Sequence, residues 1–214
     1  MKRRADAILK PAQAEYLEKL SPSRDPLLAR MEDFAAKNKH PIADPEVGQL
    51  LRILVQTRKP RHILEVGTNI GYSVIVMGRE CGRETVLETI EINPEILATA
   101  KDFVSEAKLA CDVRFHQGAA LEVIPRLKGP FDFIFIDCVK TEYEQYLDGL
   151  LPKLERGAVI VCDNLLWGGA VAETGGDANT KALRKFNKRI ATDPQLTTVV
   201  LPLGDGTGIS IVKT

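Results

Sequence analysis

The stretch Ile63-Leu-Glu-Val-Gly-Thr-Asn-Ile-Gly-Tyr-Ser73 decides the fold class. It begins as a short apolar run of the kind that forms a buried strand, and Gly67 and Gly71 then allow the backbone to turn tightly. Helical character follows from Tyr72 onward. A strand, a glycine turn and a helix in this order predict one unit of a parallel α/β sheet.

The rest of the chain repeats this alternation. The expected strands are His62–Val66, Thr85–Ile90, Asp112–His116, Phe131–Asp137 and Ala158–Asp163. Helices are expected at Tyr72–Glu80, Pro94–Lys108, Ala120–Leu127, Tyr143–Leu154 and Thr180–Thr192. A Gly-Asp-Gly turn then separates Thr197–Leu201 from Ile209–Lys213, which predicts a hairpin. The sequence therefore predicts a Rossmann-like α/β fold whose sheet is mostly parallel, with a C-terminal antiparallel hairpin and helices on both faces.

Upstream of the sheet the pattern is purely helical. Apolar residues recur at helical spacing in Ala12–Leu20 and Ser23–Lys37, and Asp44 precedes Pro45 as an N-cap precedes the first residue of a third helix. We see no linker or repeat. We expect a single domain over residues 1–214, with an N-terminal helical arm at 1–58 and an α/β core at 59–214.

Composition limits the function. Lys plus Arg and Asp plus Glu each number 29, so no net basic excess is available for nucleic acid. Apolar runs are far shorter than the roughly 20 residues of a membrane span. The cysteines form no CxxC pair, and the first residues are charged, without the apolar core of a secretory leader. We expect a protein of the cytoplasm that binds neither nucleic acid nor membrane.

The ends of the first two strands suggest a nucleoside site. In open α/β sheets ligands bind beyond the carboxyl ends of the strands. There Gly67 and Gly71 permit close approach of a ligand, and a carboxylate at Glu91 could accept both hydroxyls of a ribose. The spacing is ExGxxxG and lacks the central glycine of the GxGxxG dinucleotide fingerprint. The alternative interpretation is a structural glycine turn followed by a surface glutamate.

Two later strands end in oxygen-bearing side chains. Asp137 ends one strand, with Lys140 three residues on, and Asp163 and Asn164 end the next. If these strands are neighbours, two carboxylates and an amide meet at one edge. Such oxygen donors suit a hard cation such as Mg²⁺. Loop capping by Asp and Asn is the alternative for each element taken alone.

From Ile42 to the C-terminus the chain resembles the caffeoyl-CoA and catechol O-methyltransferase family. The matching pieces are Leu64-Glu-Val-Gly-Thr-Asn-Ile-Gly-Tyr-Ser73, Phe131-Asp-Phe-Ile-Phe-Ile-Asp137 with Lys140 and Tyr143, Asp163-Asn-Leu-Leu-Trp-Gly168 and Leu201-Pro-Leu-Gly-Asp-Gly206. They occur in the family's order and spacing and span about four-fifths of the chain.

The resemblance implies S-adenosylmethionine as methyl donor. The residues at the methionine end of its pocket would be Glu65, Gly67, Gly71, Tyr72 and Ser73. Glu91 would hold the ribose, and Gly118 and Ala119 would flank the adenine. Asp137 would lie near the amino group of the cofactor.

The resemblance also implies a metal and a base. A divalent cation, Mg²⁺ first and Mn²⁺ or Ca²⁺ also admissible, would bind Asp137, Asp163 and Asn164. Lys140 matches the general base of the family. The implied substrate is a small vicinal diphenol, and the implied assembly is a homodimer. Cys138 departs from the family pattern, as does Gly157-Ala158 where the family has two glycines, and residues 1 to about 40 match only in helical character.

Three other functions are less consistent with the sequence. The glycine spacing disfavours an NAD-type oxidoreductase. A methyltransferase for nucleic acid lacks a basic surface, although one for another small hydroxylated substrate stays open. A non-catalytic nucleoside-binding module would not explain Lys140 together with the three expected metal ligands.

Overall fold

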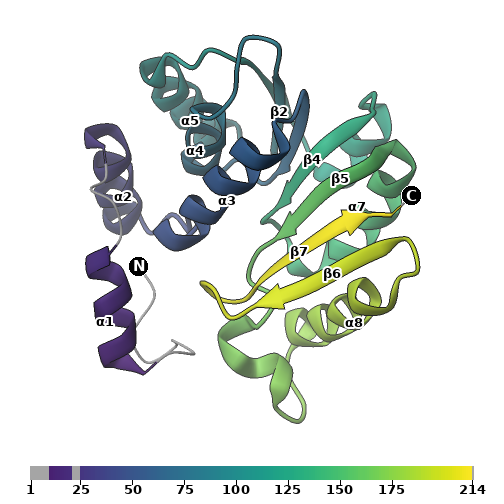
Figure 1. The fold of residues 1–214 in the computed structure, drawn as a ribbon. Helices are drawn as coiled ribbons and strands as arrows, with labels where there is room; N and C mark the ends of the chain where they lie inside the picture. Colours follow the sequence, from purple (N-terminus) through teal and green to yellow (C-terminus); the bar gives the residue numbers. More distant parts are fainter. Residues whose placement is uncertain (1–9, 21–24, 214) are drawn as a thin grey trace.

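The computed structural model describes residues 10–20 and 25–213. In this part of the chain seven strands form one sheet in the order β3-β2-β1-β4-β5-β7-β6 (Figure 1). The strands are β1 His62–Val66, β2 Val86–Glu91, β3 Asp112–Gln117, β4 Phe131–Ile136, β5 Leu154–Cys162, β6 Leu196–Leu201 and β7 Thr207–Val212. The first five are parallel, and β7 runs antiparallel between β5 and β6. The predicted mostly parallel sheet and the C-terminal hairpin are confirmed.

Helices connect and cover these strands. The α-helices are α1 Pro11–Leu20, α2 Pro26–Asn38, α3 Pro45–Arg58, α4 Tyr72–Gly78, α5 Pro94–Ala107, α6 Ala120–Val123, α7 Tyr143–Leu150 and α8 Ala178–Thr192. Short 3₁₀ turns are η2 Ile124–Arg126, η3 Lys140–Glu142, η4 Leu151–Lys153 and η5 Trp167–Ala172. None of the helices in the described ranges is both long and apolar enough to cross a membrane.

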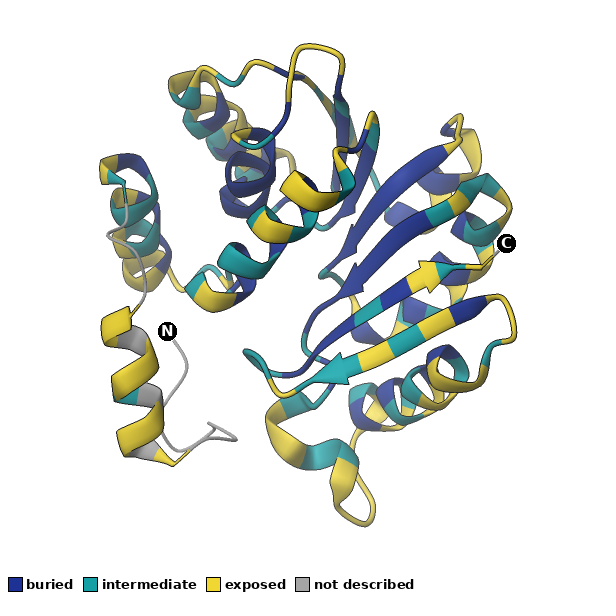
Figure 2. Cartoon of the chain, in the orientation of Figure 1, coloured by how far each residue is buried: buried dark blue, intermediate teal, exposed yellow. Residues whose placement is uncertain are grey.

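Alternating side chains of the central strands enter two separate cores. Ile63, Phe133 and Val161 face a cluster built with α2, α3 and α4. Their neighbours Leu64 and Ile134 face a second cluster, which includes α7 and α8. Because both faces are covered, β4 is buried along its whole length (Figure 2).

The strand order determines which strand ends lie together at one edge of the sheet. The chain runs outward from β1 through β2 to β3, and then returns to the other side of β1 with β4 and β5. The connections therefore diverge at the boundary between β1 and β4, which is the place where open α/β sheets bind their ligands. Gly67, Glu91, Asp137 and Asp163 each follow or end one of these strands.

Two predicted helices are shorter than expected. The helix predicted at Tyr143–Leu154 ends at Leu150, passes into a 3₁₀ turn containing Pro152, and gives way to β5 at Leu154. The helix predicted at Ala120–Leu127 likewise changes to 3₁₀ geometry at Ile124, with Pro125 in the turn. Proline lacks the N–H that an α-helix needs at each interior position.

The other boundaries differ by only a few residues. Asp44 occupies the predicted N-cap position, although its carboxylate makes no capping hydrogen bond. The predicted start of α2 at Ser23 lies outside the described residues, and the helix is described from Pro26 with Asp25 as its cap. β5 begins at Leu154, earlier than the predicted Ala158, and a register shift opposite Phe131 and Phe133 accommodates the extra residues.

Candidate functional site

The glycine turn after β1 lies against the end of β4. Gly67 has φ +106°, and a Cβ on it would lie 2.2 Å from the carbonyl oxygen of Asp137. Its amide also donates to Ile90 O at 3.1 Å, which ties the turn to β2. Gly71 has φ +84° and occupies the N-cap position of α4. Only glycine fits at position 67, because a side chain there would displace Asp137.

Glu65 is fully buried between two hydroxyl groups. Ser73 Oγ and Thr89 Oγ1 each lie 2.5 Å from one of its carboxyl oxygens, and Thr68 Oγ1 lies 2.6 Å from Thr89 Oγ1. Burial raises the pKa of Glu65 to about 8, although the two hydroxyl contacts oppose the increase. Glu65 therefore contributes to the site by joining β1 and β2 to the first turn of α4.

Tyr72 connects the same turn to the N-terminal arm. Its ring is buried, and its hydroxyl donates to Glu32 Oε1 of α2 at 2.7 Å. The sequence predicted Tyr72 as a cofactor residue. In the structure this contact places α2 next to the beginning of α4, so Tyr72 also positions the arm.

Glu91 is held by two main-chain amides. Asn69 N donates to Oε2 and Asn93 N donates to Oε1, each at 2.9 Å. The carboxylate is half-buried at the end of β2 and retains further lone pairs for a ligand. Gly118 N donates to Glu91 O at 3.0 Å, and Ala119 then occupies the N-cap position of α6. The predicted ribose and adenine residues thus occupy adjacent strand ends.

A chain of polar contacts joins the ends of β4 and β5. Lys140 Nζ donates to Asp137 Oδ1 at 2.7 Å and to Tyr143 Oη at 2.9 Å. The Tyr143 hydroxyl in turn donates to the main-chain carbonyl of Asp163 at 3.1 Å. Lys140 is only 8% exposed although it carries a charge. The structure therefore brings the predicted base into contact with one predicted metal ligand and, through Tyr143, with the backbone of another.

Burial and two carboxylates act on Tyr143. The pKa of its hydroxyl is raised well above the usual range, first by burial and then by the negative charges of Asp137 and Asp163. Both aspartates are thus close enough to influence one phenolic oxygen. Tyr143 remains a hydrogen-bond donor at working pH, which suits its contact with a carbonyl.

Asp163 and Asn164 form a tight corner after β5. Asp163 is 1% exposed, and its Oδ1 accepts hydrogen bonds from Asn164 N at 2.8 Å and Thr207 Oγ1 at 3.2 Å. Asn164 adopts a left-handed conformation with φ +62°. Loop capping, the alternative to metal binding, is therefore present at Asp163. It does not account for the contact chain that links Asp163 through Tyr143 and Lys140 to a second carboxylate, Asp137.

The composition of this corner fits a hard cation. No three His, Cys, Asp or Glu side chains within residues 10–20 and 25–213 converge as a metal site. The predicted ligands comprise two such side chains, Asp137 and Asp163, together with the amide of Asn164. A nearly buried carboxylate, a second one already bound to the cation Lys140, and an amide oxygen are donors that Mg²⁺ accepts.

Sequence reasoning missed three residues that hold the site together. Thr89 and Thr207 contact predicted site residues from other strands, and Glu32 does so from α2. No local motif marks them. Tyr143 was part of the resemblance without a role, and its spacing from Lys140 was the available signal.

Comparison with known proteins identifies the family. The O-methyltransferase family model matches residues 18–213. The chain belongs to the O-methyltransferase family. A catechol O-methyltransferase from Niastella koreensis is 32% identical over 200 residues, which cover 88% of this chain and 90% of the relative. A caffeoyl-CoA O-methyltransferase from Mesembryanthemum crystallinum is 30% identical over 84% of this chain and 76% of its own length.

Solved structures agree with this assignment. The O-methyltransferase TomG from Streptomyces achromogenes, crystallised with S-adenosylmethionine, has a TM-score of 0.86 and 29% identity, with 100% of both chains covered. The expected fold and the resemblance are thereby confirmed. Membership in the O-methyltransferase family does not favour the oxidoreductase or nucleic-acid alternatives.

Proposed function

We propose that this O-methyltransferase transfers a methyl group from S-adenosylmethionine to one hydroxyl of a small vicinal diphenol, assisted by a divalent cation. The observation that carries the proposal is the contact chain from Asp137 through Lys140 and Tyr143 to Asp163, next to the glycine turn. The names of the catechol and caffeoyl-CoA relatives and the S-adenosylmethionine complex of TomG support it.

The proposed cofactor site uses the ends of β1, β2 and β3. Glu91 would accept the ribose hydroxyls while it keeps its two amide contacts. Gly67 leaves room for the methionine end, and the first amides of α4 are available to a carboxylate. Ser73 would bind that carboxylate. When Glu65 is protonated, its proton can occupy the hydrogen bond between Glu65 and Ser73, and the Ser73 hydroxyl can then donate to the carboxylate of the cofactor. Gly118 and Ala119 would flank the adenine.

The proposed cation site is Asp137, Asp163 and Asn164, with Mg²⁺ preferred. When bound there, a divalent cation would lower the pKa of a coordinated phenol and align two neighbouring oxygens. Asp137 is bound to Lys140 in the structure, so the ammonium already neutralises part of the carboxylate charge at this corner. The three donors leave room in a six-coordinate shell for substrate oxygens and water.

Lys140 is the proposed proton acceptor. An unperturbed phenol ionises near pH 10, so a base beside the hydroxyl favours attack at neutral pH. Lys140 is buried, and its position is fixed by Asp137 and Tyr143. In its neutral form, an amine held in this position would be aligned to receive the phenolic proton, which would convert it to the ammonium.

Product mass spectrometry tests this function. The enzyme is incubated with S-adenosylmethionine, Mg²⁺ and either a catechol, a caffeoyl-type diphenol or the matching monophenol. We expect a gain of one methyl group on the diphenols and turnover lower by about 10²-fold or more on monophenols, which cannot chelate a cation. Excess EDTA should abolish turnover, and added Mg²⁺ or Mn²⁺ should restore it. Equal turnover of both phenol classes, or full activity in EDTA, would exclude the cation-assisted mechanism.

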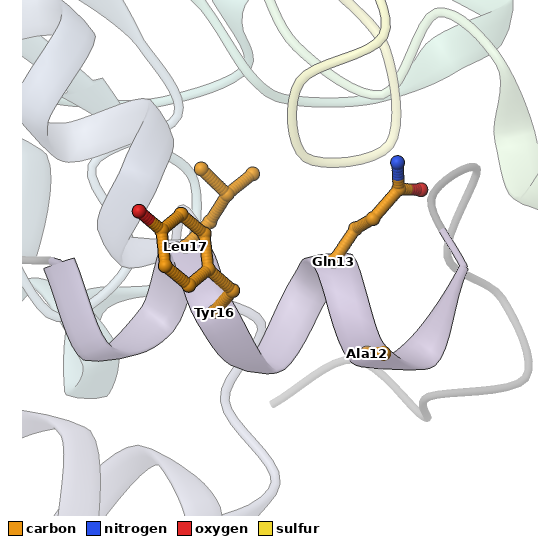
Figure 3. A pocket seen from close by; sticks show the side chains of 4 residues that line it. All are labelled: Ala12, Gln13, Tyr16 and Leu17. Carbon is orange, nitrogen blue, oxygen red and sulfur yellow. The ribbon is translucent and has the colours of Figure 1, made fainter.

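A homodimer is part of the proposal. Tyr16, Leu17 and Leu20 on α1 are large apolar side chains that are 63%, 49% and 62% exposed. Gln13, Tyr16 and Leu17 line a shallow pocket on this helix with Ala12 (Figure 3). A second chain would remove this surface from water. Light scattering at micromolar concentration should give twice the 23.6 kDa chain mass, and the monomer mass would contradict the proposal.

The remaining elements of the proposal concern organisation and location. We propose one methyltransferase domain that includes the N-terminal arm, because Tyr72 and Glu32 join the arm to the core. A cytoplasmic location agrees with the cysteines, which the structure leaves as free thiols.

A further inference from the structure

Arg184 on α8 donates hydrogen bonds to several main-chain carbonyls of a neighbouring loop. Its Nε donates to Val171 O and its Nη2 to Ala170 O, both at 2.8 Å, and further hydrogen bonds reach the carbonyls of Glu173 and Gly175. Arginine offers five N–H donors in a rigid plane. In the part of the chain that the structure describes, the partners found for this guanidinium are main-chain carbonyls, so its donors stabilise a loop conformation.

The loop that Arg184 holds has little regular structure of its own. Residues 165–177 contain a 3₁₀ segment interrupted by Gly168 and Gly169, which have φ +62° and +89°. Gly175 and Gly176 also have positive φ values. Carbonyl oxygens that point toward one another repel, and a cation placed among them removes that repulsion. The conformation of residues 170–175 therefore depends on the guanidinium.

Other residues fix the two ends of the loop. Asn187 Nδ2 donates to Leu165 O at 2.8 Å, and Gly168 N donates to Asp205 Oδ1 at 2.8 Å. At the far end Asp177 caps α8 through Thr180 N at 2.7 Å, and the Trp167 side chain also hydrogen-bonds to Asp177. The ends would stay attached if Arg184 were lost, while the middle of the loop would be released.

The position of the loop relates it to the acceptor. It begins directly after Asp163 and Asn164, which follow β5, and in Figure 1 it lies next to the end of β6 and the start of α8. Leu165 N and Leu166 N also donate to Gly206 O and Asp205 O, which joins the loop to the turn between β6 and β7. A loop anchored beside the proposed cation ligands is placed to contact a bound phenol.

We propose that Arg184 is a positioning residue that sets acceptor specificity by holding residues 170–175 as one wall of the phenol site. The proposal rests on the proposed function for its acceptor. In this proposal, cofactor binding and acceptor selection depend on different residues. Glu91 and the glycine turn would bind the cofactor, whereas Arg184 would influence which phenol is accepted without contacting that phenol.

Three variants test this role. Arg184→Ala removes the guanidinium, and Arg184→Lys keeps the charge and helix propensity but cannot span four carbonyls from one plane. Lys181→Ala removes an exposed cation from the same helix and is the matched control. Each variant is measured by amide hydrogen exchange of residues 166–176, by calorimetric affinity for S-adenosylmethionine, and by KM and kcat for catechol and for a caffeoyl-type diphenol.

Both Arg184 variants should exchange loop amides about tenfold faster or more and should raise the acceptor KM by a similar factor. The kcat/KM ratio between the two diphenols should change several-fold, because a released wall no longer favours one ring substituent. Cofactor affinity should stay within about twofold, and Lys181→Ala should match the parent enzyme. If Arg184 had only a structural role, its loss would lower kcat/KM equally for the two diphenols and leave the ratio between them unchanged.

The outcomes that overturn the inference are distinct. Parent-like exchange in Arg184→Ala would show that the guanidinium does not hold the loop. Faster exchange with an unchanged acceptor KM and an unchanged ratio would show that the loop is not an acceptor wall. If the parent enzyme methylated no diphenol, the proposed function itself would fail and the specificity role with it, whereas the exchange data would still report on the loop contact.

Discussion

Lys140 and Asp137 are in direct contact, with Nζ 2.7 Å from Oδ1. The pair lies where β4 ends, and the buried ring of Tyr143 supports the ammonium, with Nζ 5.1 Å from the ring centroid. A cation–π contact and a carboxylate therefore fix one amine at the edge of the sheet. These contacts hold the Lys140 nitrogen at a defined place, and its neutral amine form would be needed there to receive a proton.

Removal of the Lys140 amine should impair chemistry. Lys140→Ala should lower kcat by about 10²–10⁴, the usual size of a lost acid–base contribution. Lys140→Arg should not rescue activity, since a guanidinium stays protonated. Steady-state kinetics at saturating S-adenosylmethionine provides the measurement. Lys185→Ala, which removes an exposed lysine paired with Glu144, is the control. A kcat of Lys140→Ala equal to that of the parent would refute the assignment.

Truncation of Glu91 should weaken cofactor binding. Glu91→Ala removes the acceptor for two ribose hydroxyls and leaves the amides of Asn69 and Asn93 without their carboxylate. Affinity for S-adenosylmethionine should fall by a few kcal/mol, about 10²-fold, measured by calorimetry. Glu84→Ala alters an exposed glutamate before the same strand and should bind normally. Unchanged affinity in Glu91→Ala would remove Glu91 from the ribose site.

Much of the fold could be predicted because its signals are local. Apolar runs and glycine turns located every strand within a few residues, and the hairpin followed from Gly-Asp-Gly. Helical periodicity predicts that α6 and α7 run past Pro125 and Pro152, but each proline lacks the amide that an α-helix needs, so both helices end before it. In those two places a local rule was available and would have corrected the prediction.

The candidate site was predictable only in part. Strand order determined which ends meet, so Asp137, Lys140 and Asp163 could be brought together from topology alone. The contacts of Arg184 could not, because its partners are carbonyls whose positions depend on the backbone of a loop. Thr89 also gave no signal, since its contact with Glu65 requires the register of β1 against β2.

Buried Glu65 should make stability depend on pH. Its pKa is raised from an ordinary 4.5 to about 8, so the folded state keeps a proton that the unfolded chain releases. The contribution of this group is complete below pH 4.5 and is lost as pH rises to about 8, with a slope of roughly 1 kcal/mol per pH unit. Urea unfolding of the parent and of Glu65→Gln between pH 5 and pH 8 measures the difference.

The neutral variant should lack that decline. Glu65→Gln keeps an acceptor and a donor for Ser73 and Thr89, so its stability should change less between the two ends of the range. Glu84→Gln replaces an exposed carboxyl and should follow the parent curve. Parallel curves for the parent and Glu65→Gln would show that Glu65 is ionised in the folded state.

Gly67 should not tolerate a side chain. A Cβ at this position would lie 2.2 Å from the carbonyl oxygen of Asp137 and 3.0 Å from its carbonyl carbon, so β4 would have to move away from the turn. The positive φ adds a cost of about 1–2 kcal/mol for an L-residue. Gly67→Ala should therefore lose several kcal/mol of unfolding free energy. It should also lose activity beyond the loss of folded protein, because a shift of Asp137 would displace Lys140, which is hydrogen-bonded to it.

Gly82→Ala is the control, since no atom lies within 4 Å of its added Cβ. Urea unfolding gives the stability change, and kcat measured well below the unfolding midpoint gives the separate effect on the site. If Gly67→Ala unfolded like the parent and kept its kcat, the close approach of the turn to Asp137 would have no functional consequence.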